Sequence, residues 1–133
     1  MASAAFSGVG TTFNRDSVAI AEINSITGPN MTRDFIDVTS LDSTGGYREF
    51  IAGFRDGGEI TLEMNFTAAG FNDLKDDYES DVIQTYSIVL SDNAATTLTF
   101  SGFVTSLGIA VPIDDKVTCN VTIKISGQVT ITT

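Results

Sequence analysis

Residues 34–66 read DFIDVTSLDSTGGYREFIAGFRDGGEITLEMNF, and this stretch indicates two strands separated by a long loop. It begins with an alternation in which Ile36 and Val38 share one face. It ends with a more regular alternation of polar residues and the apolar residues Ile60, Leu62, Met64 and Phe66. Because successive side chains of a strand point to opposite faces, the second strand should bury one face and expose the other.

The loop between these strands has roughly 15 residues, which is longer than most connections in a compact domain. Large apolar side chains alternate in it with charged ones: Tyr47, Phe50, Ile51 and Phe54 with Arg48, Glu49, Arg55 and Asp56. Such a loop either folds back on its own domain or is buried against another molecule. Apolar groups surrounded by charges favour the second interpretation.

The chain has 133 residues, which suits a single domain over residues 1–133 with one core. It carries 7 Lys and Arg against 17 Asp and Glu, a net charge of -10. Tight, sequence-independent binding to nucleic acid requires Lys and Arg to neutralise phosphates, so the composition argues against it. A protein that lies beside DNA and weakly repels it remains compatible with this charge.

Residues suited to catalysis are scarce. The sequence has no histidine, the commonest general base and metal ligand. Its single cysteine, Cys119, is in phase with Val117 and Val121 and is expected in the core. Glu59 and Glu63 share a strand face but would lie about 13 Å apart, too far for a pair of catalytic carboxylates. We therefore expect no enzymatic activity, no cofactor and no metal.

The sequence contains no run of 18 apolar residues, so no membrane span is expected. The N-terminus has no basic residue before Arg15 and no continuous apolar segment, so no secretory signal is expected either. Residues 1–14 are rich in Ala, Ser, Gly and Thr and predict a flexible arm, which either frays or orders against a neighbouring molecule through Phe6 and Phe13.

One short helix is predicted at about residues 68–80. Thr67 is a plausible N-cap, and Phe71, Leu74 and Tyr78 have the spacing of one helix face. The other face carries Asp73, Lys75, Asp76, Asp77 and Glu79. It imitates a calcium loop without the required glycine and closing glutamate, so we interpret it as a solvated face.

The remaining segments predict strands. Residues 18–26 form the first, and Tyr86, Ile88 and Leu90 mark another. Leu98, Phe100 and Val104 predict a further strand, and residues 107–113 a separate one that ends near Pro112. Residues 117–131 keep one apolar parity and predict an unusually long last strand, which Gly127 could bend. The predicted fold is mainly β, a β-sandwich or barrel with one short α-helix, a long loop between the second and third strands and an N-terminal arm.

Four segments together resemble a known family: residues 26–29 (ITGP), 36–40 (IDVTS), 45–53 (GGYREFIAG) and 56–60 (DGGEI). In them the chain resembles the major tail tube protein of long, flexible-tailed (siphovirus-type) bacteriophages, most densely over residues 20–66. The resemblance implies a small β-sandwich that closes into six-membered rings. It also implies that the rings stack into the hollow tube through which the genome leaves the virion.

Under this resemblance, the loop and the arm would make the contacts between subunits and rings, through Asp42, Tyr47, Arg48, Glu49, Phe50, Ile51, Phe54, Arg55, Phe6 and Phe13. The polar strand faces would line the DNA channel through Glu59, Thr61, Glu63, Asn65 and Asn120. Six copies of a chain with charge -10 carry -60, which would repel phosphates. The implied partners are further copies of the chain, tape-measure protein and DNA in the lumen, and tail-tip and terminator proteins, with no membrane. The implied location is the virion tail, after assembly in the host cytoplasm.

Two other functions remain open at this stage. One is a monomeric β-sandwich that decorates a virion or binds a host surface, in which the arm and the long loop would have no role. The other is the tube protein of a bacterial contractile secretion system, which the fold alone does not distinguish.

Overall fold

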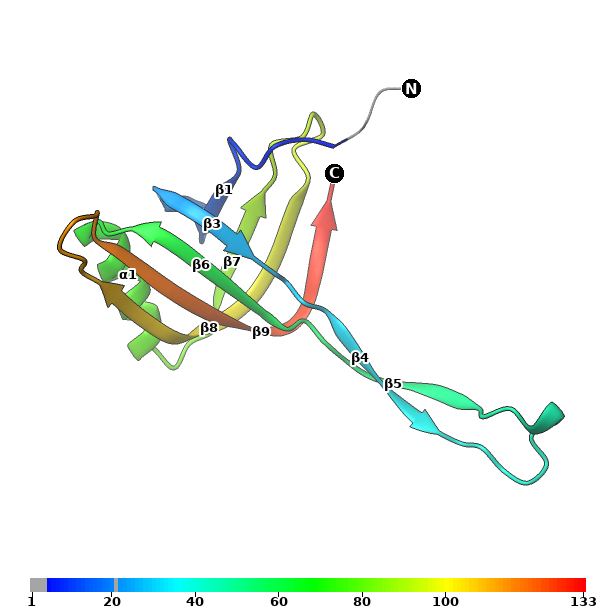
Figure 1. Cartoon of the computed structure of the whole chain (residues 1–133). Coiled ribbons are helices and arrows are strands. Elements are labelled where there is room, and N and C mark those ends of the chain that lie inside the picture. The colour runs from blue at the N-terminus through cyan, green and yellow to red at the C-terminus, as the bar shows by residue number, and fades with distance from the viewer. Residues whose placement is uncertain (1–4, 21) are drawn as a thin grey trace.

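The computed structural model describes residues 5–20 and 22–133 (Figure 1). Its elements, in chain order, are β1 (Thr12–Arg15), β2 (Val18–Ile20), β3 (Ile23–Thr27), β4 (Thr32–Asp37), the 3-10 turn η1 (Thr44–Gly46), β5 (Phe50–Asp56), β6 (Glu59–Asn65), α1 (Ala68–Glu79), β7 (Gln84–Val89), β8 (Thr97–Ala110) and β9 (Thr118–Thr132). The prediction of a mainly β protein with one short helix is confirmed.

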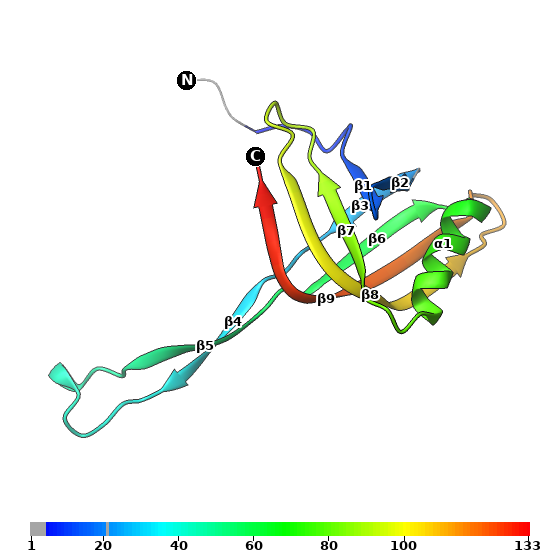
Figure 2. The ribbon, with the colours of Figure 1, turned by 180° about the vertical axis from the view of Figure 1, so that it is seen from behind.

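Seven strands form one antiparallel sheet in the order β2-β1-β7-β8-β9-β6-β3, while β4 and β5 form a separate two-stranded sheet. The long strands β8 and β9 curve, so that β6 and β7 lie on opposite sides of the molecule's body (Figures 1 and 2). Gly127 has a φ of +91° within β9, a conformation that favours glycine, and the strand bends there. Among the described strands β2 and β3 remain open edges, so the sheet is sandwich-like and not a closed barrel.

The inward faces of the curved sheet form one apolar core. The predicted alternation of β6 is observed, with Ile60, Leu62 and Met64 fully buried and Glu59, Thr61 and Glu63 exposed. Cys119 is also buried, as predicted. The other buried apolar residues come from six elements: Phe13, Ile20, Leu74, Tyr86, Ile88, Phe100, Val104, Val121, Ile123 and Ile125.

Helix α1 covers one end of the sheet (Figure 2). The Thr67 hydroxyl accepts a hydrogen bond from the Gly70 N–H at 3.2 Å, which confirms the predicted N-cap. The predicted solvated face is wrong at Asp77, which is 2% exposed, whereas Tyr78 of the predicted apolar face is about half exposed. The helix is rotated so that Leu74 and Asp77, three residues apart, face the core together.

The N-terminal segment differs from the predicted arm. Residues 1–4 of that arm lie outside the described residues, and residues 12–15 form β1, which pairs with both β2 and β7. Phe13 is therefore no contact for a neighbouring subunit, because it is fully buried and stacks on Tyr86 with 5.6 Å between ring centroids. The sequence shows no alternation of apolar and polar residues around Phe13, because its neighbours are small and polar.

Two predicted strand boundaries are also wrong. Residues 18–26 contain two strands, because Glu22 has a φ of +62° and interrupts the extended chain. The two strands predicted over residues 98–113 are one continuous β8, whose register against β9 shifts between Val104 and Ser106. That irregularity reverses the parity of the apolar residues and imitates a strand break in the sequence. The predicted long last strand is confirmed, since β9 has 15 residues.

Candidate functional site

The predicted strand around Ile36 and the long loop after it together form a projecting β-hairpin. Strands β4 and β5 pair antiparallel, with Ile36 opposite Ile51, and extend away from the seven-stranded sheet (Figures 1 and 2). Every residue of β4 is exposed, including Ile36, and so is every residue of β5 except Gly53. Both faces of this hairpin meet solvent, so it is free to bury itself against another molecule.

Large apolar side chains cover the hairpin. Phe35 is 70% exposed and meets the edge of Phe50, with ring centroids 5.2 Å apart. The other exposed apolar residues of the hairpin and its tip are Ile36, Val38, Leu41, Tyr47, Ile51 and Phe54, and Phe54 is 89% exposed. Contiguous exposed apolar groups of this size are characteristic of interaction surfaces.

The tip of the hairpin is ordered by polar contacts. Arg48 forms an ion pair with Asp37 at 3.1 Å, and the backbone N–H of Glu49 donates to the Thr39 hydroxyl at 2.8 Å. The Glu49 carboxylate also accepts from the Ser43 hydroxyl at 3.1 Å. Hydrogen bonds from Thr39, and then the Arg48 contact, lower the pKa of Asp37. In the free subunit Arg48 and Glu49 therefore hold the tip together, while Asp42 is exposed without a role in this network.

Two glycines fix the direction in which the hairpin leaves the sheet. Gly28 precedes β4 with a φ of +105°, and Gly58 follows β5 with a φ of +80°. A Cβ on Gly28 would lie 2.4 Å from the Glu59 carbonyl oxygen, and one on Gly58 would lie 2.2 Å from the Asn30 carbonyl oxygen. Only glycine lets the two chains pass so closely at this crossing.

The structure brings eight of the ten predicted contact residues together on the hairpin and its tip: Asp42, Tyr47, Arg48, Glu49, Phe50, Ile51, Phe54 and Arg55. Phe6 lies apart from them in the N-terminal segment and is 52% exposed. Phe13 belongs to the core, as described above.

The five residues predicted to line a channel lie on one face of the seven-stranded sheet. Across the sheet, Glu63 is opposite Ser25 of β3 and Asn120 of β9, and Asn120 is opposite Gly108 of β8. The next row continues this polar face with Thr27, Thr61, Thr122 and Ser106. Glu59 and Asn65 have the same parity as Glu63 on β6 and complete the set.

This polar face has little positive charge. Glu59 lies opposite Lys124 of β9, which in turn lies opposite Phe103 of β8. The Lys124 ammonium forms an ion pair with Asp56 at 2.9 Å. Lys124 and Phe103 belong to the face by register but were not predicted. Lys124 has the same parity as Asn120 on the last strand and could have been identified from it, whereas the register shift between Val104 and Ser106 hides Phe103.

A polar network under α1 was not predicted from the sequence. Arg15 donates to both carboxylate oxygens of Asp77, at 2.6 and 2.7 Å, and the Tyr86 hydroxyl donates to the same carboxylate at 2.7 Å. Desolvation and then the Asp77 contact raise the pKa of Tyr86 above its usual range. This network joins the helix to β1 and β7 and points to a structural role.

Groups of three or more His, Cys, Asp or Glu able to hold a metal are absent from the described part of the chain. Within residues 5–20 and 22–133, no helix is long and apolar enough to cross a membrane.

Comparison with known proteins identifies the family. Sequence comparison with curated proteins gives no match. A chain of the native gene transfer agent virion has the same fold, with a TM-score of 0.78 at 19% identity over 97% of this chain and 100% of that one. A chain of the anti-feeding prophage tube-terminating cap has a TM-score of 0.78 at 16% identity, over 100% of this chain and 94% of that one. A chain of the sheath-tube complex of an extracellular contractile injection system has a TM-score of 0.72 at 18% identity, over 92% of this chain and 87% of that one.

These structures agree with the fold alone, whereas the family model for the lambda phage tail tube protein matches residues 5–132, nearly the whole sequence. The chain belongs to the lambda phage tail tube protein family.

Proposed function

We propose that this tail tube protein assembles into stacked six-membered rings, and that the β4–β5 hairpin makes contacts between them. The observation that carries the proposal is the hairpin itself, which exposes aromatic and aliphatic side chains on both faces while its tip is held by hydrogen bonds. A monomeric protein gains nothing from such an element. In a contact between copies, burial of its apolar surface would contribute about 25 cal/mol per Å².

The polar face of β6 and β9 would line the channel for DNA. It consists mainly of Ser, Thr and Asn, with Glu59 and Glu63 and with Lys124 held by Asp56. Such a wall offers few cations to phosphates, so DNA would slide along it without binding tightly. Tape-measure protein would occupy the same channel before DNA does.

The proposed partners at the tube ends are tail-tip and terminator proteins. The structures with the same fold include a tube terminator, a tube-terminating cap and a baseplate, which supports this part of the proposal by analogy. The subunits would assemble in the host cytoplasm and act in the virion tail. We propose a purely structural role, without enzymatic activity or cofactor.

A tube protein of a contractile system is the second candidate, because a chain of a sheath-tube complex shares the fold. That function would require the outer wall of the tube to bind a sheath protein. Co-purification of tubes with a sheath protein from the native host would favour this candidate, and tubes that remain bare would favour a flexible tail.

The test is negative-stain electron microscopy of the purified protein at low and high concentration, with hollow filaments or six-membered rings as the expected result. The variant Arg48→Ala/Phe50→Ala should fold normally and fail to form tubes. The matched variant Lys116→Ala/Ile113→Ala removes an exposed cation and an exposed apolar side chain from another loop and should form tubes. Normal tubes from the hairpin variant would contradict the role of the hairpin.

A further inference from the structure

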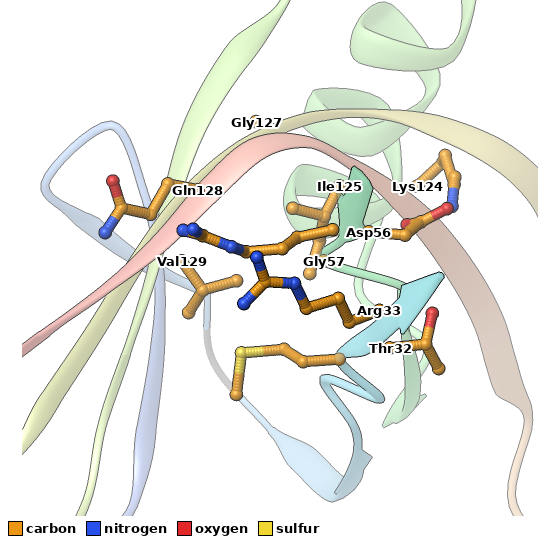
Figure 3. Close-up of a pocket in the computed structure, with 11 residues that line it drawn as sticks. Thr32, Arg33, Asp56, Gly57, Lys124, Ile125, Gly127, Gln128 and Val129 are labelled. Carbon is orange, nitrogen blue, oxygen red and sulfur yellow. The ribbon is translucent and has the colours of Figure 1, made fainter. Parts of the chain in front are cut away.

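A cavity of about 650 Å³ lies where the base of the hairpin meets the bend of β9. We call it the basal pocket, and its walls are the start of β4, the end of β5 and the stretch of β9 around Gly127. Figure 3 shows the guanidinium of Arg33 extending into the pocket toward Val129, while Lys124 and Asp56 face each other at the other side. The pocket is separate from the apolar surface of the hairpin and from its tip.

The basal pocket concentrates positive charge in an acidic chain. Three of the seven Lys and Arg residues line it: Arg33, Arg55 and Lys124. Asp56 is the only carboxylate among the lining residues, and it is engaged by Lys124 at 2.9 Å, which is the main cause of its lowered pKa. Neither Arg33 nor Arg55 forms an ion pair with any residue that the structure describes.

The two arginines are placed unfavourably in the free subunit. Arg33 lies directly opposite Arg55 in the register of β4 and β5, and like charges in that position destabilise a strand pair. Arg33 has one hydrogen bond, from its Nε to the Gly53 carbonyl oxygen at 3.3 Å. A carboxylate entering the pocket would relieve the repulsion, since the planar fork of a guanidinium matches a carboxylate.

The C-terminal end of α1 carries unfavourable negative charge. Asp76 and Glu79 lie in its last turn, Asp81 follows, and all three are exposed. The helix has no basic residue in that turn, although the negative end of its dipole favours cations there. Lys75 pairs with Glu79 at 3.2 Å, which leaves Asp76 and Asp81 available to a neighbour.

The base of the hairpin and α1 lie at opposite ends of the seven-stranded sheet in both views (Figures 1 and 2). Two different surfaces at opposite ends are what a head-to-tail contact between identical copies requires, and such contacts repeat into rings or filaments. We infer that the basal pocket of one subunit binds the acidic end of α1 of the next copy, with Arg33 and Arg55 contacting Asp76 and Asp81. This inference rests on the proposed self-assembly.

The test is a charge-exchange cycle in the full chain, with assembly measured by sedimentation velocity and electron microscopy. Arg33→Glu/Arg55→Glu and Asp76→Arg/Asp81→Arg should each raise the concentration needed for assembly by about tenfold or more, which corresponds to about 1.4 kcal/mol. The four changes combined restore the net charge of the original chain and should restore assembly. Lys116→Glu, a reversal at an exposed lysine outside the pocket, should have little effect.

The outcomes separate this inference from the proposed function. Unchanged assembly of the Arg33→Glu/Arg55→Glu variant, in a protein that forms tubes, would overturn the inference alone. Lost assembly that the combined variant fails to restore would also overturn it, because the pocket would then bind something other than this helix end. A protein that stays monomeric at every concentration would overturn both proposals.

Discussion

Asp77 attaches α1 to the sheet through charge as well as packing. It is nearly fully buried and satisfies both Arg15 and the Tyr86 hydroxyl, so its removal leaves a cation and a buried hydroxyl without their acceptor. Because the Arg15 side chain is 26% exposed, solvent should offset part of the loss. We expect Asp77→Ala to lower the free energy of unfolding by about 3 kcal/mol, measured by urea denaturation.

Lys75→Ala is the control for this prediction. It removes a partner of the exposed Lys75–Glu79 ion pair on the same helix and should cost about 0.5 kcal/mol or less. Equal effects of the two variants would show that Asp77 does not anchor the helix.

Asp92 predicts a pH dependence at the turn between β7 and β8. The Thr96 hydroxyl and then its backbone N–H donate to the carboxylate, at 2.6 and 2.8 Å, and these hydrogen bonds lower the pKa of Asp92. The folded state therefore favours the ionised form. The resulting stability is present above the unfolded pKa of about 3.9 and is lost as the pH falls through the lower folded value.

We therefore expect Asp92→Asn to lower the melting temperature at neutral pH, and we expect this difference to shrink below about pH 4. Circular dichroism of both proteins between neutral and acidic pH would measure it. Asp114→Asn removes the same charge from another loop and controls for the change in net charge. A difference of the same size at acidic and neutral pH would contradict the prediction.

At the scale of elements, the sequence predicts those that have one buried face. Strands β6 and β9 and helix α1 were predicted because apolar residues repeat in them with the period of the element. Strand β4 overlaps the strand predicted from Ile36 and Val38, whereas β5 was predicted as loop, because exposure of both faces removes the alternation of apolar and polar residues. Its residues were still identified as a contact surface, since their composition does not depend on that alternation.

Phe13 and Asp77 were misplaced because no repeating pattern marks either of them as buried. Phe13 is a single large apolar residue in a four-residue strand, which is too short to show a period. Asp77 is a charged residue on a buried face, and no local pattern reveals that Arg15, 62 positions away, is its partner. Only the tertiary structure brings these groups together.

Gly58 gives a prediction about the direction of the hairpin. An alanine there would keep a φ of about +80° only with strain, and its Cβ would collide with the Asn30 carbonyl. Gly46→Ala is a matched control, because Gly46 has a φ of +73° at the hairpin tip and open space around its Cβ. We expect Gly58→Ala to displace the hairpin and prevent tube formation, and Gly46→Ala to cost about 1–2 kcal/mol while tubes still form. Normal tubes from Gly58→Ala would show that the crossing does not set the direction of the hairpin.

At the scale of the whole molecule, charge is distributed by function in the proposed tube. The chain has a net charge of -10, three of its seven cations lie at the hairpin base, and its polar sheet face carries mainly uncharged side chains with two glutamates. In the tube, Arg33 and Arg55 would be paired in contacts between copies and Lys124 with Asp56, which would leave the channel wall with few groups free to bind phosphate. Low affinity for DNA is then a property of the assembly as much as of the composition.

This distribution predicts how the channel responds to added positive charge. Thr61→Lys/Asn120→Lys places two cations per subunit on the polar face, where both residues are exposed. Tubes assembled in the presence of short duplex DNA should then retain DNA in the pellet after centrifugation, and added salt should release it. The unmodified tubes should retain little at the same salt. The control variant Asp114→Lys/Asp115→Lys adds positive charge to a loop outside this face and should retain less DNA than the channel variant. Equal retention by the two variants would mean that this face does not line the channel, because a cation inside the tube would meet a confined duplex along its whole length.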